Sequence, residues 1–102
     1  MMFTKKEISS AEVILEVHGA LNGDTADQFQ KNLEELAASP HRIITLNLSD
    51  VNAINSSCIG KILLFRKRLS EENRTIRITG CSDSLYNTFQ LIKFDKLIDI
   101  KK

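Results

Sequence analysis

The sequence predicts a small α/β domain built on a mainly parallel β-sheet. Strand-like and helix-like segments alternate along the chain, which is the pattern of such folds. Residues 43–48 form a nearly continuous apolar run, typical of a strand covered on both faces in a parallel sheet. The chain has 102 residues, the length of one domain. We therefore expect residues 1–102 to form a single domain.

The first half of the chain predicts two strands and a helix. Residues 12–17 are rich in β-branched side chains, and a weaker strand is predicted over residues 4–8. Thr25 and Gln28 have the spacing of a capping box, so a helix is predicted over residues 25–38. Its apolar residues recur at spacings of three and four, which places them on one face. They are Ala26, Phe29, Leu33, Leu36 and Ala37.

The second half predicts the alternating strands and helices that complete the sheet. We expect helices over residues 57–70 and 83–92, a strand over residues 75–79, and a last short strand within residues 97–100. The parallel strands imply right-handed crossovers, and in so short a chain the helices can all lie on one face. The predicted core contains Leu15, Phe29, Leu33, Ile44, Leu46, Ile62, Leu63, Ile76 and Ile78.

Composition excludes several classes of protein. The 14 basic and 13 acidic residues leave a net charge of +1, which argues against a general nucleic-acid binder. No apolar run approaches the roughly 20 residues of a membrane helix, so membrane insertion is not expected. Two cysteines make no disulfide framework, which favours a reducing, cytoplasmic location. We expect no metal or other cofactor, because the candidate zinc ligands lack any paired short spacing. Those candidates are His18, His41, Cys58 and Cys81.

The candidate functional site lies where the parallel strands end, since α/β sheets gather function beyond their carboxyl ends. Three segments are expected to meet there, namely residues 18–24, 47–58 and 80–84. The middle segment leads into a helix N-terminus marked by Ser56 and Ser57. Free N–H groups and the helix dipole favour anions at such an end, so a phosphoserine would be accommodated. The alternative is that Asn55 or Ser56 only caps the helix.

Residues 48–60, Leu-Ser-Asp-Val-Asn-Ala-Ile-Asn-Ser-Ser-Cys-Ile-Gly, resemble the signature of the STAS domain. This is the family of sulfate transporters and anti-sigma factor antagonists. Residues 19–22 resemble the family's Gly-x-Leu-Asp turn, and residues 94–100 resemble its C-terminal motif. The resemblance covers essentially the whole chain. It implies a STAS-like mixed, mostly parallel sheet of four to five strands with three to four helices.

The resemblance also implies a function. In the small bacterial members the second serine of the signature is phosphorylated by a partner that is both anti-sigma factor and serine kinase, and this serine matches Ser57. The chain is then expected to be an anti-sigma factor antagonist, a protein-binding regulator of transcription and not an enzyme. It would sequester the kinase, and phosphorylation would switch it off. A phosphatase that acts on phosphorylated Ser57 is a further candidate partner. We expect Ser56 to cap the helix while Ser57 faces the partner.

Four positions around this serine depart from the family pattern. Asn22, Asn47 and Asn55 stand where the family usually has aspartates, and Cys58 stands where it usually has glycine. If the asparagines cluster, the surroundings of Ser57 are neutral, and their amides can donate to a phosphate. The alternative function is a non-switching STAS interaction subunit of a transporter or stress-signalling complex. Cys58 is either a packed small residue or, at a helix start where thiol pKa values fall, a redox-sensitive one.

Overall fold

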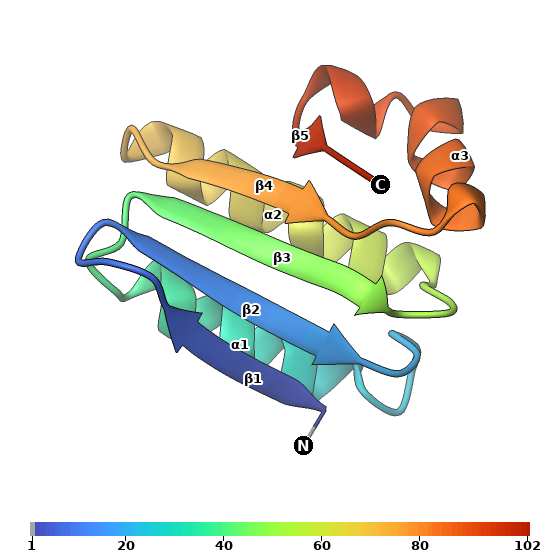
Figure 1. The fold of residues 1–102 in the computed structure, drawn as a ribbon, viewed down its shortest axis with the longest axis horizontal. Helices are drawn as coiled ribbons and strands as arrows, with labels where there is room; N and C mark the ends of the chain where they lie inside the picture. Colours follow the sequence, from blue (N-terminus) through green and yellow to red (C-terminus); the bar gives the residue numbers. More distant parts are fainter. Residues whose placement is uncertain (1) are drawn as a thin grey trace.

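The computed structural model describes residues 2–102, which form a five-stranded sheet flanked by helices (Figure 1). The predicted order of strands and helices is confirmed, and a short 3-10 helix, η1, adds to it between the third helix and the last strand. The elements are β1 (Phe3–Glu7), β2 (Glu12–His18), α1 (Ala26–Ala37), β3 (Ile43–Asp50), α2 (Ser56–Glu71), β4 (Thr75–Thr79), α3 (Asp83–Leu91), η1 (Phe94–Lys96) and β5 (Asp99–Ile100).

The order of the strands in the sheet follows their order in the chain, from β1 at one edge to β5 at the other. β1 and β2 are antiparallel, and all the other neighbours are parallel, as predicted. Leu46 of β3 lies between Leu15 of β2 and Ile78 of β4. Between Glu16 and His18 the register of β2 against β3 shifts. The carboxyl ends of β2, β3 and β4 therefore meet at one end of the sheet.

The helices α1 and α2 cover one face of the sheet and lie behind it in Figure 1. Leu15, Leu46 and Ile78 point to this face and are fully buried. The expectation that β3 is covered on both faces is wrong, because neither helix crosses to the other side. On that open face Thr45 is still buried, since the flanking strands β2 and β4 crowd it.

One of the predicted core residues is exposed. Leu63 on α2 is 40% exposed. It belongs to an apolar run in which helical spacing alone does not decide which residue turns inward. The other predicted core residues are buried, as expected. They are Leu15, Phe29, Leu33, Ile44, Leu46, Ile62, Ile76 and Ile78.

Side chains at the two ends of α1 make contacts that the sequence does not reveal. The prediction of a capping box is wrong, because the Thr25 hydroxyl makes no cap hydrogen bond. It instead donates to the Ala20 carbonyl at 2.9 Å. At the other end Arg74 donates from Nη2 to the Leu36 carbonyl at 2.9 Å and from Nη1 to the Ala37 carbonyl at 2.7 Å. A distant arginine thus satisfies carbonyls that the helix itself leaves free.

Candidate functional site

Two loops at the carboxyl end of the sheet are joined by main-chain hydrogen bonds. Leu21, after β2, forms an isolated parallel bridge with Ile54, after β3. The Leu21 N–H donates to the Ala53 carbonyl at 2.9 Å, and the Asn55 N–H donates to the Leu21 carbonyl at 2.9 Å. This pairing holds the loop before α1 against the start of α2, as the sequence predicted for residues 18–24 and 47–58.

Asn55, and not Ser56, caps α2. Its backbone is extended, with φ −93° and ψ 169°, and its Oδ1 accepts the Cys58 N–H at 2.9 Å. The expectation that Ser56 caps the helix is therefore wrong. The amide side chain of Asn55 reaches the N–H of the third helical residue, the usual partner of a cap. Ser56 and Ser57 are the first two residues of the helix, and both are exposed.

The first turn of α2 has a positive electrostatic character. It contains no acidic residue, and its free N–H groups carry the positive end of the helix dipole. Lys61 follows Ser57 by four residues and so lies one turn further along the same face. The corresponding neighbour of Ser56 is Gly60, which has no side chain to offer. An anionic group on Ser57 would thus meet both the helix end and an ammonium group.

Asn22 lies beside this helix start, since Leu21 is hydrogen bonded to Asn55. The Oδ1 of Asn22 accepts the Asp24 N–H at 2.9 Å, in a local turn. Asn22 and Asn55 each use a side-chain oxygen as the acceptor, which an aspartate would also supply. The two departures from the family pattern therefore keep the hydrogen bonds of the loops and remove two negative charges from the surroundings of Ser57.

Asn47 does not join this pair. It alternates along β3 with the buried residues Leu46 and Leu48, so its side chain points to the open face, away from α2. Its Oδ1 accepts the Ser49 N–H at 3.0 Å. Gly80, just after β4, packs against the side chain of Asn47. A Cβ at Gly80 would lie 2.9 Å from Asn47 Oδ1, and the φ of Gly80 is +74°, in the left-handed region. Asn47 thus supports the turn after β4.

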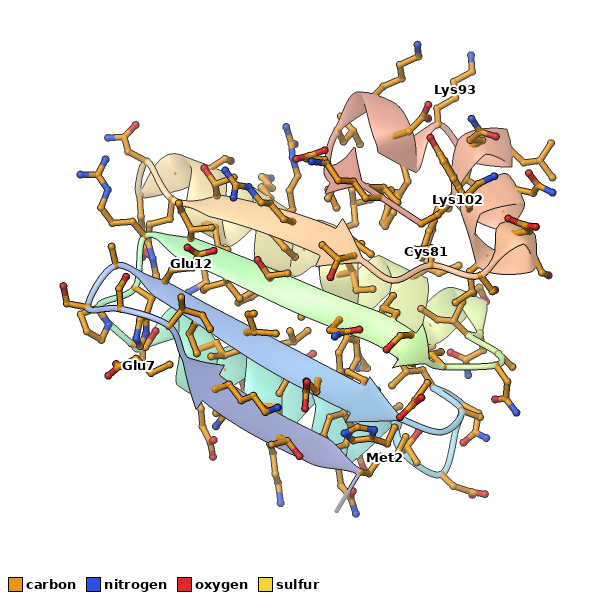
Figure 2. All side chains as sticks on the ribbon, in the orientation of Figure 1. Met2, Glu7, Glu12, Cys81, Lys93 and Lys102 are labelled. Carbon is orange, nitrogen blue, oxygen red and sulfur yellow. The ribbon has the colours of Figure 1, made fainter. Side chains whose placement is uncertain are left out.

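The thiols of Cys58 and Cys81 are buried and are not activated. Cys58 is fully buried in α2, where burial raises the pKa of its thiol, although the nearby charge of Lys61 opposes this. Cys81 follows β4 (Figure 2), and burial raises the pKa of its thiol to about 11. Burial thus keeps both thiols in the protonated form at neutral pH, which favours the interpretation of Cys58 as a packed small residue. Within residues 2–102, no three histidine, cysteine, aspartate or glutamate side chains are grouped to hold a metal ion.

A histidine–carboxylate pair, which the sequence does not predict, lies at the same end of the sheet. His18 Nδ1 lies 2.7 Å from Asp50 Oδ2, and the Glu16 carboxylate lies 3.9 Å from Nε2 of the same ring. The pair joins the ends of β2 and β3. The contact requires the register shift between Glu16 and His18, and no local sequence signal predicts that shift.

One flank of α2 combines exposed apolar side chains with a cation. Leu63 lies about one turn before Arg66, whose Nε donates to the Leu97 carbonyl at 3.2 Å. The residues Leu63 and Leu97 are 40% and 44% exposed. Leu63, Arg66 and Leu97 together make up the surface that we call the α2–η1 flank. No helix within residues 2–102 has the length and apolar character needed to cross a bilayer.

The chain is similar to known proteins in sequence and in fold. Residues 4–99 match the family described as "Mlab, STAS domain". A STAS-domain containing protein of Pseudomonas aeruginosa strain UCBPP-PA14 is 25% identical over 89 residues, which cover 87% of each chain. The crystal structure of a Thermotoga maritima protein described as an anti-sigma factor antagonist has a TM-score of 0.89 and 26% identity, covering 99% of this chain and 86% of that one.

Two less similar structures share the fold. The anti-sigma factor antagonist SpoIIAA, in its unphosphorylated form, has a TM-score of 0.82 at 15% identity over 98% of this chain and 88% of its own. A sulfate transporter family protein of Wolinella succinogenes has a TM-score of 0.76 at 19% identity, covering 94% of this chain and 80% of that one. The STAS-like fold implied by the sequence is thus confirmed. With the match over residues 4–99, the chain belongs to the STAS domain family.

Proposed function

We propose that the chain is an anti-sigma factor antagonist: a cytoplasmic, protein-binding regulator that sequesters an anti-sigma factor with serine kinase activity. Phosphorylation of Ser57 switches it off, and a phosphatase restores it. The observation that carries the proposal is the exposed Ser57 hydroxyl in the first turn of α2, at the position of the second signature serine. The likeness to the Thermotoga maritima protein described as an anti-sigma factor antagonist supports it.

Phosphorylation acts through charge. A phosphoserine carries roughly −2 charge at neutral pH and three acceptor oxygens. At Ser57 these oxygens are within reach of the free N–H groups of the helix and of Lys61. The modified serine is therefore tolerated by the fold. A partner that packs closely against the unmodified helix start must desolvate the new charge without a counter-charge of its own, and the complex weakens.

Ser57 is also better placed than Ser56 to carry a phosphate group, because a positive charge lies beside it. Consecutive residues at a helix start point about 100° apart, so only one of the two hydroxyls faces a given partner. Lys61 stands one turn from Ser57, whereas Gly60 stands one turn from Ser56. A phosphate on Ser56 would have the helix end but no ammonium group beside it.

The partner surface that we propose extends from the helix start along the α2–η1 flank. Asn22 and Asn55 surround Ser57 with uncharged polar groups, and Leu63 supplies an exposed apolar side chain one to two turns further along α2. Buried apolar anchors ringed by polar groups are typical of protein interfaces. Such a surface binds a protein without any catalytic step of its own.

A second candidate function is a fixed STAS interaction subunit of a transporter or stress-signalling complex. The neutral amides of Asn22 and Asn55 favour it, because a kinase that recognises the family's aspartates would lose both charges. The match to the "Mlab, STAS domain" family is compatible with either function. The two candidates differ in whether Ser57 is ever modified.

The test combines phosphate transfer with capture of partners. The full chain is incubated with the candidate kinase and ATP, and phosphopeptides are identified by mass spectrometry. We expect modification of the wild type and of Ser56→Ala, and none of Ser57→Ala. In capture from native cytoplasm, Ser57→Asp is expected to recover the partner at least about tenfold less than the wild type does. Ser56→Asp, the matched control, is expected to lose less.

Two results would decide against the switch. Modification at Ser56 alone would overturn the assignment of the acceptor. If nothing is modified while a control antagonist is labelled, and Ser57→Asp captures the same partners as the wild type, the fixed-subunit function holds.

A further inference from the structure

The two helices that cover the sheet carry opposite charges. Within residues 26–37, α1 has three acidic residues and one basic residue. Within residues 56–71, α2 has four basic residues and one acidic residue. The net charge of the whole chain hides this separation, because it is only +1. Not all of these charges face outward, because Glu35 of α1 pairs with Lys5 and Arg66 of α2 donates to the Leu97 carbonyl. Without these two residues α1 is still net acidic and α2 is still net basic.

A groove of about 190 Å³ runs between the two helices. Its apolar part is formed by Leu33 and Ala37 of α1 and by Leu64 and Phe65 of α2. Leu64 is 70% exposed and stands out of this face. Covering this side chain with a partner would be favourable, because it would remove apolar surface from water.

Charged side chains line the groove on both sides. Glu34 lies on the α1 side, and Lys61 and Arg68 lie on the α2 side. The Glu34 carboxylate accepts a hydrogen bond from Gln30 at 3.1 Å, within its own helix. Among the ion pairs of the described residues, none joins Glu34 to Lys61 or Arg68. These charges therefore remain available to a molecule that docks on the groove.

We propose that the molecule that docks here is a second copy of this chain, packed face to face through α1 and α2. Two arrangements are possible, each with a two-fold axis in the plane between the two copies. An axis parallel to the helices places the acidic α1 of each copy over the basic α2 of the other. An axis perpendicular to the helices would instead place α1 over α1 and α2 over α2, with like charges opposed. The charge separation thus selects the first arrangement, in which the contacts are made twice.

The size of the face predicts a weak dimer. The two helices are about 18 Å and 24 Å long, and each is about 10 Å wide. Together they offer a face of roughly 20 by 20 Å, less than the ~800 Å² per partner of a standard stable interface. The dimer is therefore expected to depend on protein concentration and to weaken with salt. This inference does not rest on the proposed function, since Ser57 lies at the end of the helix layer and the groove lies along it.

Charge reversal tests the arrangement. The full chain is followed by sedimentation velocity from about 10 to 500 μM protein, at about 50 mM and about 500 mM NaCl. We expect a dimer at high protein concentration that weakens with salt. Glu34→Arg and Arg68→Glu are each expected to weaken it at least about tenfold. The combined swap, Glu34→Arg with Arg68→Glu, is expected to restore it to within about threefold of the wild type.

Controls separate this result from misfolding and from other faces. Lys96→Glu on η1 makes the same charge change as Arg68→Glu and should leave the dimer unchanged. Thermal unfolding of each variant reports whether the monomer still folds. In amide spectra of the wild type, dilution is expected to shift the signals of Glu34, Lys61 and Leu64.

The proposal is overturned by a monomer at every concentration, or by a dimer that withstands both single reversals. Dilution shifts confined to the open sheet face or to the α3–η1 region would also overturn it. Loss of phosphate transfer to Ser57 would contradict only the proposed function, because the sedimentation readout does not involve the kinase.

Discussion

The Oδ1 atom of Asn55 accepts a 2.9 Å hydrogen bond from the main-chain N–H of Cys58. This contact decides where α2 begins, and so it decides which residues are presented in the first turn. Because Asn55 is the cap, neither Ser56 nor Ser57 is needed to satisfy the helix end. Both hydroxyls are free to meet a partner, and the choice between them depends on their neighbours.

Removing the cap should destabilise the protein, whereas removing the neighbouring hydroxyl should not. We expect Asn55→Ala to lower the free energy of unfolding by about 0.5–2 kcal/mol, the usual cost of a lost cap. Asn55→Asp keeps the acceptor oxygen and should stay close to the wild type. Ser56→Ala is the matched control, with an expected change below about 0.5 kcal/mol. Urea unfolding measures all three, and a larger loss in Ser56→Ala than in Asn55→Ala would contradict this assignment of the cap.

A negative charge at Ser57 should be tolerated by the fold. The first turn of α2 has no acidic residue, and Lys61 lies one turn away. Ser57→Asp is therefore expected to raise the free energy of unfolding by about 0.3–1 kcal/mol at low salt, through the helix dipole. The gain should shrink when Lys61→Gln is combined with it, and it should fall at high salt. A marked loss of stability in Ser57→Asp would mean that any weaker partner binding comes from unfolding.

The order of the elements could be predicted because it depends on local patterns. The apolar run of residues 43–48 and the helical spacing of residues 26–37 each identify one element without reference to the rest of the chain. Which face of the sheet is covered depends on where both helices pack, and no local pattern carries that information. Leu63 shows the same limit, since it belongs to an apolar run in which several residues compete for the interior.

Part of the site could be predicted for the same reason, and part could not. Asn22 and Asn55 come together because loops at the ends of neighbouring parallel strands must meet. The family pattern places Asn47 with them, yet strand alternation turns its side chain to the other face. The pairing of His18 with Asp50 depends on a register shift, which appears only when two strands are aligned in space.

Truncation of Leu46 and of Leu63 should have very different effects on stability, because only Leu46 belongs to the core. Leu46 is fully buried in the central strand, while Leu63 is 40% exposed on α2. Leu46→Ala is expected to lower the free energy of unfolding by about 2–5 kcal/mol, because it leaves a cavity. Leu63→Ala should cost less than about 1 kcal/mol but should weaken capture of the partner. Chemical denaturation and capture are measured on the same preparations, and equal stability losses in the two variants would contradict the burial described here.

Substitution of Gly60 should have opposite effects on stability and on partner binding. It lies inside α2, and a Cβ placed on it meets no atom within 4 Å. Gly60→Ala is therefore expected to raise the free energy of unfolding by about 0.5–1 kcal/mol, through the higher helix propensity of alanine. If the partner approaches the helix start closely, the added methyl group weakens capture while the fold becomes more stable. Gly80→Ala is the contrasting control, because its φ of +74° and its contact with Ser49 make alanine strained there. A loss of stability in Gly60→Ala would show that this position is more crowded than the structure indicates.

The buried thiol of Cys81 should make the protein less stable in alkaline solution. Burial raises its pKa from 9.0 to about 11, so the folded state keeps its proton after the unfolded state has lost it. The stabilisation is fully present below pH 9 and is lost as the pH rises from 9 towards 11. A shift of this size corresponds to at most about 3 kcal/mol in the free energy of unfolding.

Cys81→Ala removes the titrating group, so the free energy of unfolding of this variant should fall less steeply between pH 9 and 11 than that of the wild type. Urea unfolding at pH 8, 9, 10 and 11 compares the two slopes, which cancels the titration of lysine and tyrosine side chains common to both proteins. Parallel slopes would mean that the Cys81 thiol titrates in the folded protein much as it does in the unfolded chain.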